Sequence, residues 1–182
     1  MVDKQYKLKK KIQLVTPGLK TNGGIRVLID MANFFQNKSY DVEILCAFID
    51  KDLIFNIDED IKVSSYPNLN NKFISTIIFI IYSFLKIKSK NLIISFHFIG
   101  FYLCSVKSIF TKLKHFYFVQ GIENIQDGFF SYIFNKLCML SYNYNNIITS
   151  NISIYNSLNE KNYSPKYNIN IGISENFFKL QN

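Results

Sequence analysis

The feature that most constrains the fold is an alternation of short apolar runs with longer segments of helical periodicity. The runs predict strands at 12–16 (IQLVT), 41–48 (DVEILCAF), 61–64, 92–95 (LIIS), 115–119 (HFYFV), 146–149 and 168–171. The periodic segments predict helices at 25–36, 72–88, 98–110, 128–143 and 150–158. Strands that are apolar along their whole length are buried on both faces, as in a parallel sheet between helices. The sequence therefore predicts an α/β fold with a Rossmann-like parallel sheet sandwiched by helices.

The length and composition indicate one ordered domain. The chain has 182 residues, of which 48% are hydrophobic and only 19% charged, so it can bury a sizeable core. We expect this domain to occupy residues 1–174 and residues 175–182 to begin an interdomain linker. Cys46, Cys104 and Cys138 are odd in number and lie in apolar runs, so we expect buried free thiols and a reducing compartment.

The charge balance narrows the classes of partner. The net charge is +8, but Arg26 is the only arginine, and nucleic-acid readers depend on arginine for bidentate contacts. We therefore expect no nucleic-acid partner. Residues 1–11 lack the apolar core of a signal peptide, and the apolar run 73–85 is too short to span a bilayer. These features predict a cytoplasmic protein.

The apolar run 73–85 has two interpretations. A helix that is apolar all round is more often buried in a core. Lys86, Lys88 and Lys90 follow the run at once, however, and a basic, apolar patch of this kind can rest on an anionic membrane surface. The sequence therefore also predicts the anionic inner surface of the cell membrane as a partner.

The strongest local motif is the glycine loop TNGG after the first predicted strand. Gly23 and Gly24 carry no Cβ, so a phosphate or sugar can approach their backbone, and the following helix directs its positive dipole end at that place. A plain strand-to-helix turn explains the glycines equally well. The spacing differs from GxGxxG, which argues against a nicotinamide-dependent oxidoreductase.

Polar residues follow three further strands at the carboxyl ends, where open α/β sheets bind ligands. His97 follows the strand 92–95 and can hydrogen-bond a sugar hydroxyl or transfer a proton, unless it is simply a half-buried structural histidine. Gln120 and Glu123 follow the strand 115–119, and Glu123 can act as a base or as a helix N-terminal carboxylate. Ser150 follows the strand 146–149 and either lines the cleft or helps to cap the next helix. His115 opens a strand, and we expect it to be structural.

Five segments, in order, resemble the N-terminal domain of bacterial GT-B glycosyltransferases of family 4. They are KIQLVTPGLKTNGGIRVLIDMANFFQNKSYDVEILC, NLIISFHFIG, HFYFVQGIEN, NIITSNISIYNSL and NINIGISENFF. The last resembles the crossing into the second domain, usually N-G-[IV]-D, with Ile171 inserted and Ser174 in place of the acid.

This resemblance implies that the chain is one of the two domains of an enzyme. Two Rossmann-like domains would face a cleft, with a glycan or lipid-linked acceptor on this domain and most of the nucleotide-sugar donor on the other. Gly23 and Gly24 match the glycine loop that reaches the donor phosphates, Arg26 would help to neutralise them, and no metal or other cofactor is expected. His97 and Glu123 would be catalytic, and Gln120 and Ser150 would contact substrate. We expect the chain to be a hexosyltransferase domain of polysaccharide biosynthesis that is inactive alone.

One alternative remains open at this point. A single-domain protein of this kind can be a stand-alone nucleotide- or partner-binding module, for instance one half of a split glycosyltransferase.

Overall fold

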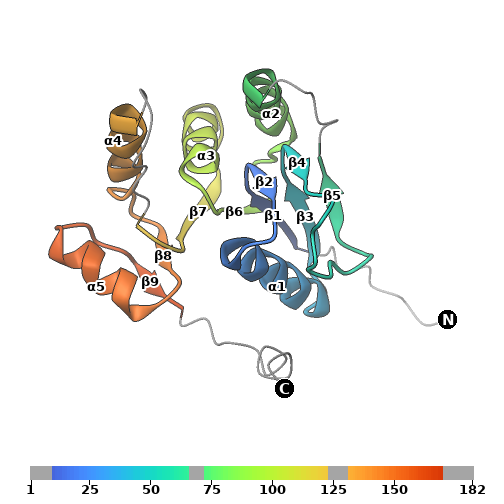
Figure 1. Cartoon of the computed structure of the whole chain (residues 1–182), viewed down its shortest axis with the longest axis horizontal. Helices are drawn as coiled ribbons and strands as arrows, with labels where there is room; N and C mark the ends of the chain where they lie inside the picture. Colours follow the sequence, from blue (N-terminus) through green and yellow to red (C-terminus); the bar gives the residue numbers. More distant parts are fainter. Residues whose placement is uncertain (1–9, 66–71, 123–130, 170–182) are drawn as a thin grey trace. The chain divides into compact units, whose positions relative to one another are not determined.

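The structure is a computed structural model of the chain and describes residues 10–65, 72–122 and 131–169. Seven strands form one parallel sheet, which confirms the predicted fold class (Figure 1). Their order in the sheet is β5-β3-β1-β6-β7-β8-β9. Their bounds are β1 Lys11–Val15, β3 Asp41–Leu45, β5 Lys62–Ser64, β6 Leu92–Ser95, β7 Lys114–Val119, β8 Ile147–Thr149 and β9 Tyr167–Asn168. A separate pair joins β2 (Gly18–Leu19) to β4 (Phe48–Ile49).

The described helices are α1 Gly23–Asn37, α2 Lys72–Lys86, α3 Phe98–Phe110, α4 Ser131–Ser141 and α5 Ile152–Glu160. The chain divides into two compact units, Met1–Tyr117 and Phe118–Asn182, and β7 runs from the first into the second. In the first unit α1 covers one face of the sheet, while α2 and α3 lie together on the other (Figure 1). No helix of the described ranges is long and apolar enough to cross a bilayer.

The first unit folds around the apolar side chains that the periodicity predicted. Helix α1 buries Ile25, Leu28, Ile29 and Ala32, which recur at helical spacing on one stripe. On the other face, a core cluster of α2, α3 and strand residues surrounds Val15. A Cβ on Gly100 would lie 3.3 Å from the Val15 Cγ1 atom, so this glycine lets α3 approach β1 closely.

Helix α2 departs from the expectation of a buried helix. Phe79 and Ser83 are buried, but Ile77, Ile81 and Leu85 are 41%, 58% and 73% exposed. The prediction of burial is therefore wrong for one face of this helix, because α2 packs on the sheet and α3 from one side only. The sequence pattern alone did not distinguish the exposed apolar residues of this helix from its core residues.

Several predicted boundaries also change, most by one or two residues. The predicted strand 41–48 splits into β3 and β4, because the amide of Ala47 bonds to the carbonyl of Pro17 rather than to the sheet. The helix predicted from residue 150 begins at Ile152, because Asn151 is its N-cap. The last strand is Tyr167–Asn168; Ile169 is not part of it, and 170–171 lie outside the described residues. The predicted domain end at residue 174 also lies outside them.

The two predictions about buried groups in the core are confirmed. Cys46, Cys104 and Cys138 are buried free thiols, and burial raises the pKa of the Cys46 and Cys104 thiols to about 12. His115 is buried, with its Nε2 atom 2.8 Å from the Ser95 hydroxyl.

Candidate functional site

The order of the sheet creates a topological switch point between β1 and β6. The two strands pair in parallel, with Val15 opposite Ser95 at their carboxyl ends. The chain leaves β1 towards α1 on one face of the sheet and leaves β6 towards α3 on the other (Figure 1). In open α/β sheets, ligands bind in the crevice outside such diverging carboxyl ends. We call the loop 16–24 together with His97 the switch-point site.

The loop after β1 is held in place by the loop after β3. Gly18 pairs with Phe48, and a Cβ on Gly18 would lie 2.4 Å from the Phe48 ring, so only glycine fits beneath that ring. The Thr21 hydroxyl donates a hydrogen bond of 2.7 Å to the carbonyl of Asp52. These contacts fix the path of the chain into α1. This role of Phe48 was not predicted from the sequence, in which only the Pro17-Gly18 turn indicates a fixed loop.

Gly23 and Gly24 open helix α1. The Asn22 side chain caps the helix by accepting a hydrogen bond of 2.9 Å from the amide of Ile25. No acidic residue lies in the first turn, so no carboxylate of that turn offsets the positive end of the helix dipole. A Cβ on Gly23 would meet no atom within 4 Å. Packing therefore does not require glycine at this position, and the space over its backbone is open.

Arg26 lies in the same first turn, and its side chain is half-buried. Its Nε atom is 3.7 Å from the Asp30 carboxylate, one helical turn further on. An ion pair of this length near the surface is weak. The role of Arg26 in neutralising phosphate stays a prediction.

His97 is the N-cap of helix α3. Its Nδ1 atom accepts a hydrogen bond of 3.2 Å from the amide of Ile99, and its ring lies 4.5 Å from the Phe98 ring. The switch-point geometry thus places this histidine directly after the carboxyl end of β6, as predicted. A capping role for the imidazole was not predicted, because the more usual capping residues are Ser, Thr, Asp and Asn.

Burial lowers the pKa of His97 to about 4, so the imidazole is neutral at pH 7. A neutral imidazole with an accepting Nδ1 atom carries its proton on Nε2. In this state His97 can donate a hydrogen bond to a hydroxyl or phosphate oxygen. The hydrogen-bonding and the catalytic role of His97 both stay predictions.

Gln120 and Ser150 belong to the second unit. Each follows the carboxyl end of a strand, Gln120 after β7 and Ser150 after β8. Ser150 is buried, its amide donates to the carbonyl of Val119 at 3.1 Å, and its hydroxyl lies 3.4 Å from the carbonyl of Gln120. These contacts tie the ends of β7 and β8 together.

In the second unit Asn151 caps helix α5, and its side chain accepts a hydrogen bond of 2.9 Å from the amide of Ile154. The alternative that Ser150 helps to cap α5 is therefore not needed. Glu123 lies outside the described residues, and its catalytic role stays a prediction, as do the substrate contacts of Gln120 and Ser150.

The fold and the switch point together define a Rossmann-like α/β protein. No protein-family model and no curated protein sequence matches the chain. Among solved structures, it is similar to sucrose-phosphate synthase from Thermosynechococcus elongatus, with a TM-score of 0.63 and 8% sequence identity. The match covers 87% of this chain and 47% of that enzyme, so the chain spans about half the length of its structural neighbour. The neighbour is a GT-B glycosyltransferase, which supports a GT-B-like fold for this chain.

Proposed function

We propose that the chain is the acceptor-side domain of a glycosyltransferase that moves a sugar from a nucleotide-sugar to a glycan or lipid-linked acceptor. The single observation that carries the proposal is the fold match, which covers 87% of the chain and about half of a GT-B glycosyltransferase. The finer assignment to family 4, to hexosyl transfer and to polysaccharide biosynthesis rests on the motif resemblance alone.

The switch-point site supports a contact with the donor diphosphate. Gly23 leaves open space over the start of α1, and the first turn of that helix lacks a carboxylate. Backbone amides and the positive dipole end of a helix stabilise phosphate oxygens at such a place. The neutral His97, a donor through Nε2, would add a hydrogen bond from the opposite side of the switch point.

Because the chain spans about half of its neighbour, we infer that sugar transfer needs a donor-binding half, either in the same polypeptide or in a separate subunit. The second arrangement is the split transferase that the sequence left open. Intact mass spectrometry of the native gene product separates the two: about twice the mass of this chain supports the first arrangement. A product of 21.3 kDa supports the second.

The proposal is tested by binding and turnover with the 182-residue chain. Amide chemical shifts followed by NMR during titration with uridine and guanosine diphosphates should change first at Gly23 and Gly24. Gly23→Ala should not reduce stability, because a Cβ at this position meets nothing within 4 Å. It should weaken nucleotide binding at least fivefold, because the new methyl group would occupy the space that a bound phosphate needs.

Gly121→Ala is the matched control, since a Cβ there also meets nothing within 4 Å and the residue does not begin a helix. Equal affinity of Gly23→Ala and the unmodified chain would refute the phosphate contact at α1. Turnover of a nucleotide-sugar by the chain alone would refute the requirement for a second half.

A further inference from the structure

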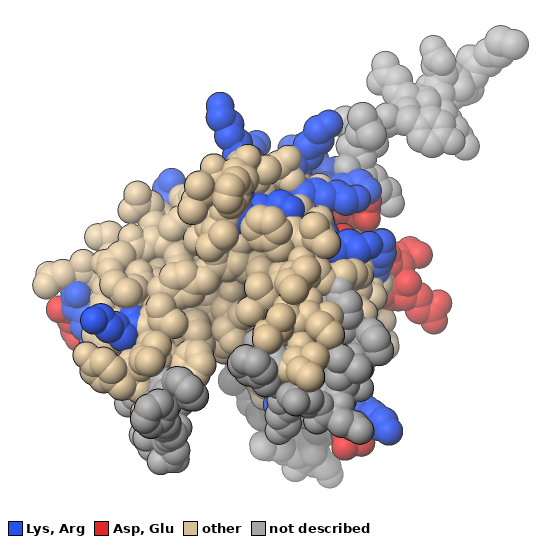
Figure 2. All heavy atoms as spheres, turned by 90° about the horizontal axis from the view of Figure 1, so that it is seen from above, with Lys and Arg blue, Asp and Glu red and all other residues tan. Residues whose placement is uncertain are grey.

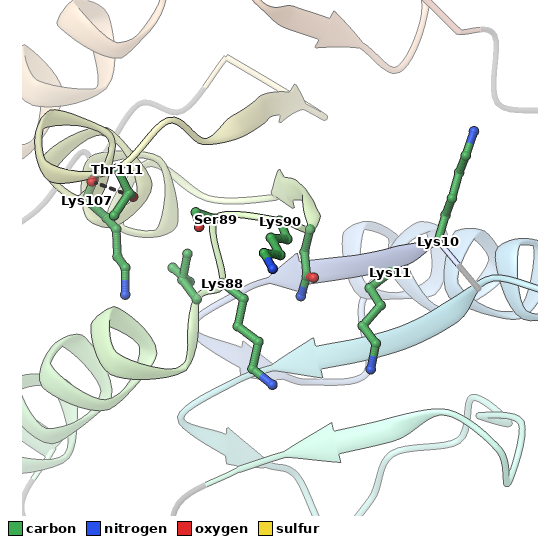
Figure 3. Close-up of a pocket in the computed structure, with 9 residues that line it drawn as sticks. Lys10, Lys11, Lys88, Ser89, Lys90, Lys107 and Thr111 are labelled. Carbon is green, nitrogen blue, oxygen red and sulfur yellow. Dashed lines mark hydrogen bonds between the residues drawn. The ribbon is translucent and has the colours of Figure 1, made fainter. Parts of the chain in front are cut away.

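A second polar site lies at the opposite end of the sheet. An open groove of about 590 Å³ is formed where β1 and β6 begin and where α2 and α3 end. Five lysines line it: Lys10, Lys11, Lys88, Lys90 and Lys107 (Figure 3). Because β1 is five residues long, this groove is about 15 Å from the switch-point site along the strand direction. We call it the lysine groove.

Among the described residues, few acidic groups pair with the lysines of the groove. Lys11 pairs with Asp41 at 2.6 Å, and the ammonium of Lys107 donates to the carbonyl of Phe84. For Lys10, Lys88 and Lys90 the structure shows no ion pair with any described residue. In Figure 3, Lys88 and Lys11 extend side by side, whereas Lys10 points away from them. The groove thus concentrates cations from several segments around one hollow.

Helix stability does not account for Lys10, Lys88 and Lys90. A lysine in the last turn of a helix is favoured by the helix dipole, which explains Lys86 in α2 and Lys107 in α3. Lys88 and Lys90 lie beyond the end of α2, in the turn that leads into β6, and Lys10 precedes β1. Repulsion among these ammonium groups costs free energy that a bound anion would offset.

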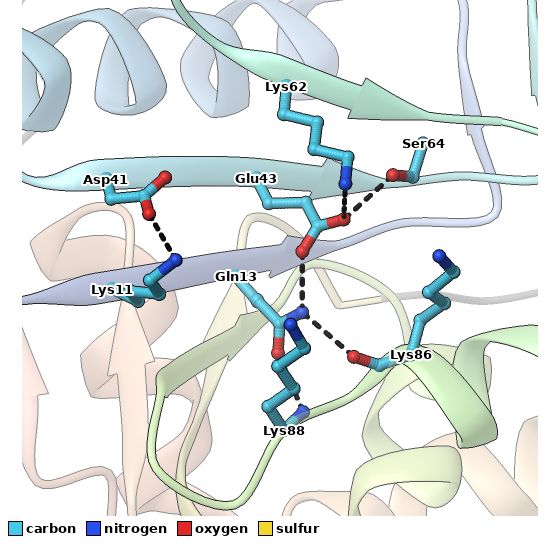
Figure 4. A network of polar contacts seen from close by, with 8 residues as sticks. All are labelled: Lys11, Gln13, Asp41, Glu43, Lys62, Ser64, Lys86 and Lys88. Carbon is cyan, nitrogen blue, oxygen red and sulfur yellow. Dashed lines mark hydrogen bonds and ion pairs between the residues drawn. The ribbon is translucent and has the colours of Figure 1, made fainter.

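The segment that carries Lys88 is fixed by a buried polar network (Figure 4). Gln13 is buried in β1, donates to the carbonyl of Lys86 at 3.1 Å and accepts from the amide of Lys88 at 3.0 Å. It also donates to Glu43 at 2.9 Å, which in turn accepts from Ser64. A fixed backbone at Lys88 means that less conformational freedom is lost when an anion binds.

Exposed apolar side chains lie within two residues, in sequence, of residues that line the groove. Leu85 at the end of α2 and Ile109 and Phe110 at the end of α3 are each more than 70% exposed. Figure 2, which faces the side of α2 and α3, shows mostly uncharged atoms over the middle of this surface and most of the Lys and Arg side chains nearer its margins. Lysines beside exposed apolar side chains are the combination that binds the headgroup and acyl boundary of an anionic bilayer.

We propose that the lysine groove is a phosphate-binding site, distinct from the switch-point site and independent of the sugar-transfer proposal. The ligand chemistry is a phosphate group, which is present both in anionic lipid headgroups and in soluble polyphosphate. The adjacent Leu85, Ile109 and Phe110 favour the lipid headgroup as the source, since a soluble anion makes no use of them.

The test compares Lys88→Gln/Lys90→Gln with Lys51→Gln/Lys161→Gln, a control pair with the same charge change outside the groove. Co-sedimentation is measured with vesicles of phosphatidylcholine and of phosphatidylcholine mixed equally with phosphatidylglycerol. We expect binding to the anionic vesicles only, weakened about 25-fold by the groove pair, at about fivefold per lysine. The control pair should retain binding within about twofold, since neither of its lysines lines the groove.

Two further measurements separate the sources. Leu85→Ser/Ile109→Ser should weaken vesicle binding but not the binding of tripolyphosphate measured by calorimetry. Tripolyphosphate binding that needs Lys88 and Lys90, without vesicle binding, would support a site for a soluble anion. Absence of both forms of binding would overturn the proposal, and so would equal losses in the groove and control pairs. Thermal melts by circular dichroism confirm that each variant is folded.

Discussion

Replacing Gln13 by leucine tests the polar network beneath the lysine groove. Gln13 is buried in the central strand β1 and makes three hydrogen bonds of 2.9–3.1 Å, to Glu43, Lys86 and Lys88. Leucine has a similar size and leaves no large cavity, so the change removes the hydrogen bonds and little else. It leaves the carbonyl of Lys86 and the amide of Lys88 without the partner that Gln13 supplied.

The expected loss of stability follows from these three bonds. The bond to the Glu43 carboxylate is charge-assisted and contributes about 2 kcal/mol, and the two backbone bonds contribute about 1 kcal/mol each. Burial of the leucine side chain offsets about 1 kcal/mol of this sum. We therefore expect Gln13→Leu to lower the free energy of unfolding by about 3 kcal/mol.

Urea unfolding followed by circular dichroism measures this loss, with Lys11→Gln as the control on the same strand. Lys11 forms an exposed ion pair with Asp41, so its replacement should change stability little. Native-state hydrogen exchange should also show faster exchange at the Lys88 amide in Gln13→Leu. A stability loss below about 1 kcal/mol, with Lys88 exchange unchanged, would refute the network as the element that fixes the groove.

The two histidines give the remaining predictions. His97→Ala should lower the free energy of unfolding by about 1 kcal/mol through loss of the α3 cap, while His97→Asn should keep the cap. Both variants should weaken the binding of nucleotide diphosphates. Unchanged binding would show that His97 is not part of the site. Burial lowers the pKa of His97 to about 4 and of His115 to about 3. As pH falls below about 6.5 the unfolded state takes up protons that the folded state does not, so stability is lost progressively down to pH 3–4. The free energy of unfolding, measured by urea unfolding, should fall over this range by up to about 1.4 kcal/mol per histidine per pH unit, and less steeply in His115→Gln. A flat profile would contradict the burial of both rings.

The candidate site was predictable in position but not in detail. Gly23 and His97 were found because each follows an apolar run that forms a strand, and carboxyl ends of parallel strands are where ligands bind. That His97 caps α3 through Nδ1 was not predictable, since the cap depends on the backbone angles at the start of the helix. The fixing of the loop by Phe48 over Gly18 involves segments 30 residues apart, which no local pattern relates.

The sequence by itself determined the class of fold and most of its elements. Side-chain periodicity is a local property, so the runs 92–95 and 98–110 coincide with β6 and α3 at both ends. Only the tertiary structure decided which apolar residues are core and which are surface. Phe79 and Ile81 are two residues apart in one apolar helix, yet one is buried and the other is 58% exposed, because α2 packs against the sheet from a single side. The lysine groove is likewise a tertiary feature, since parallel strand pairing brings residues 10–11 beside residues 88–91.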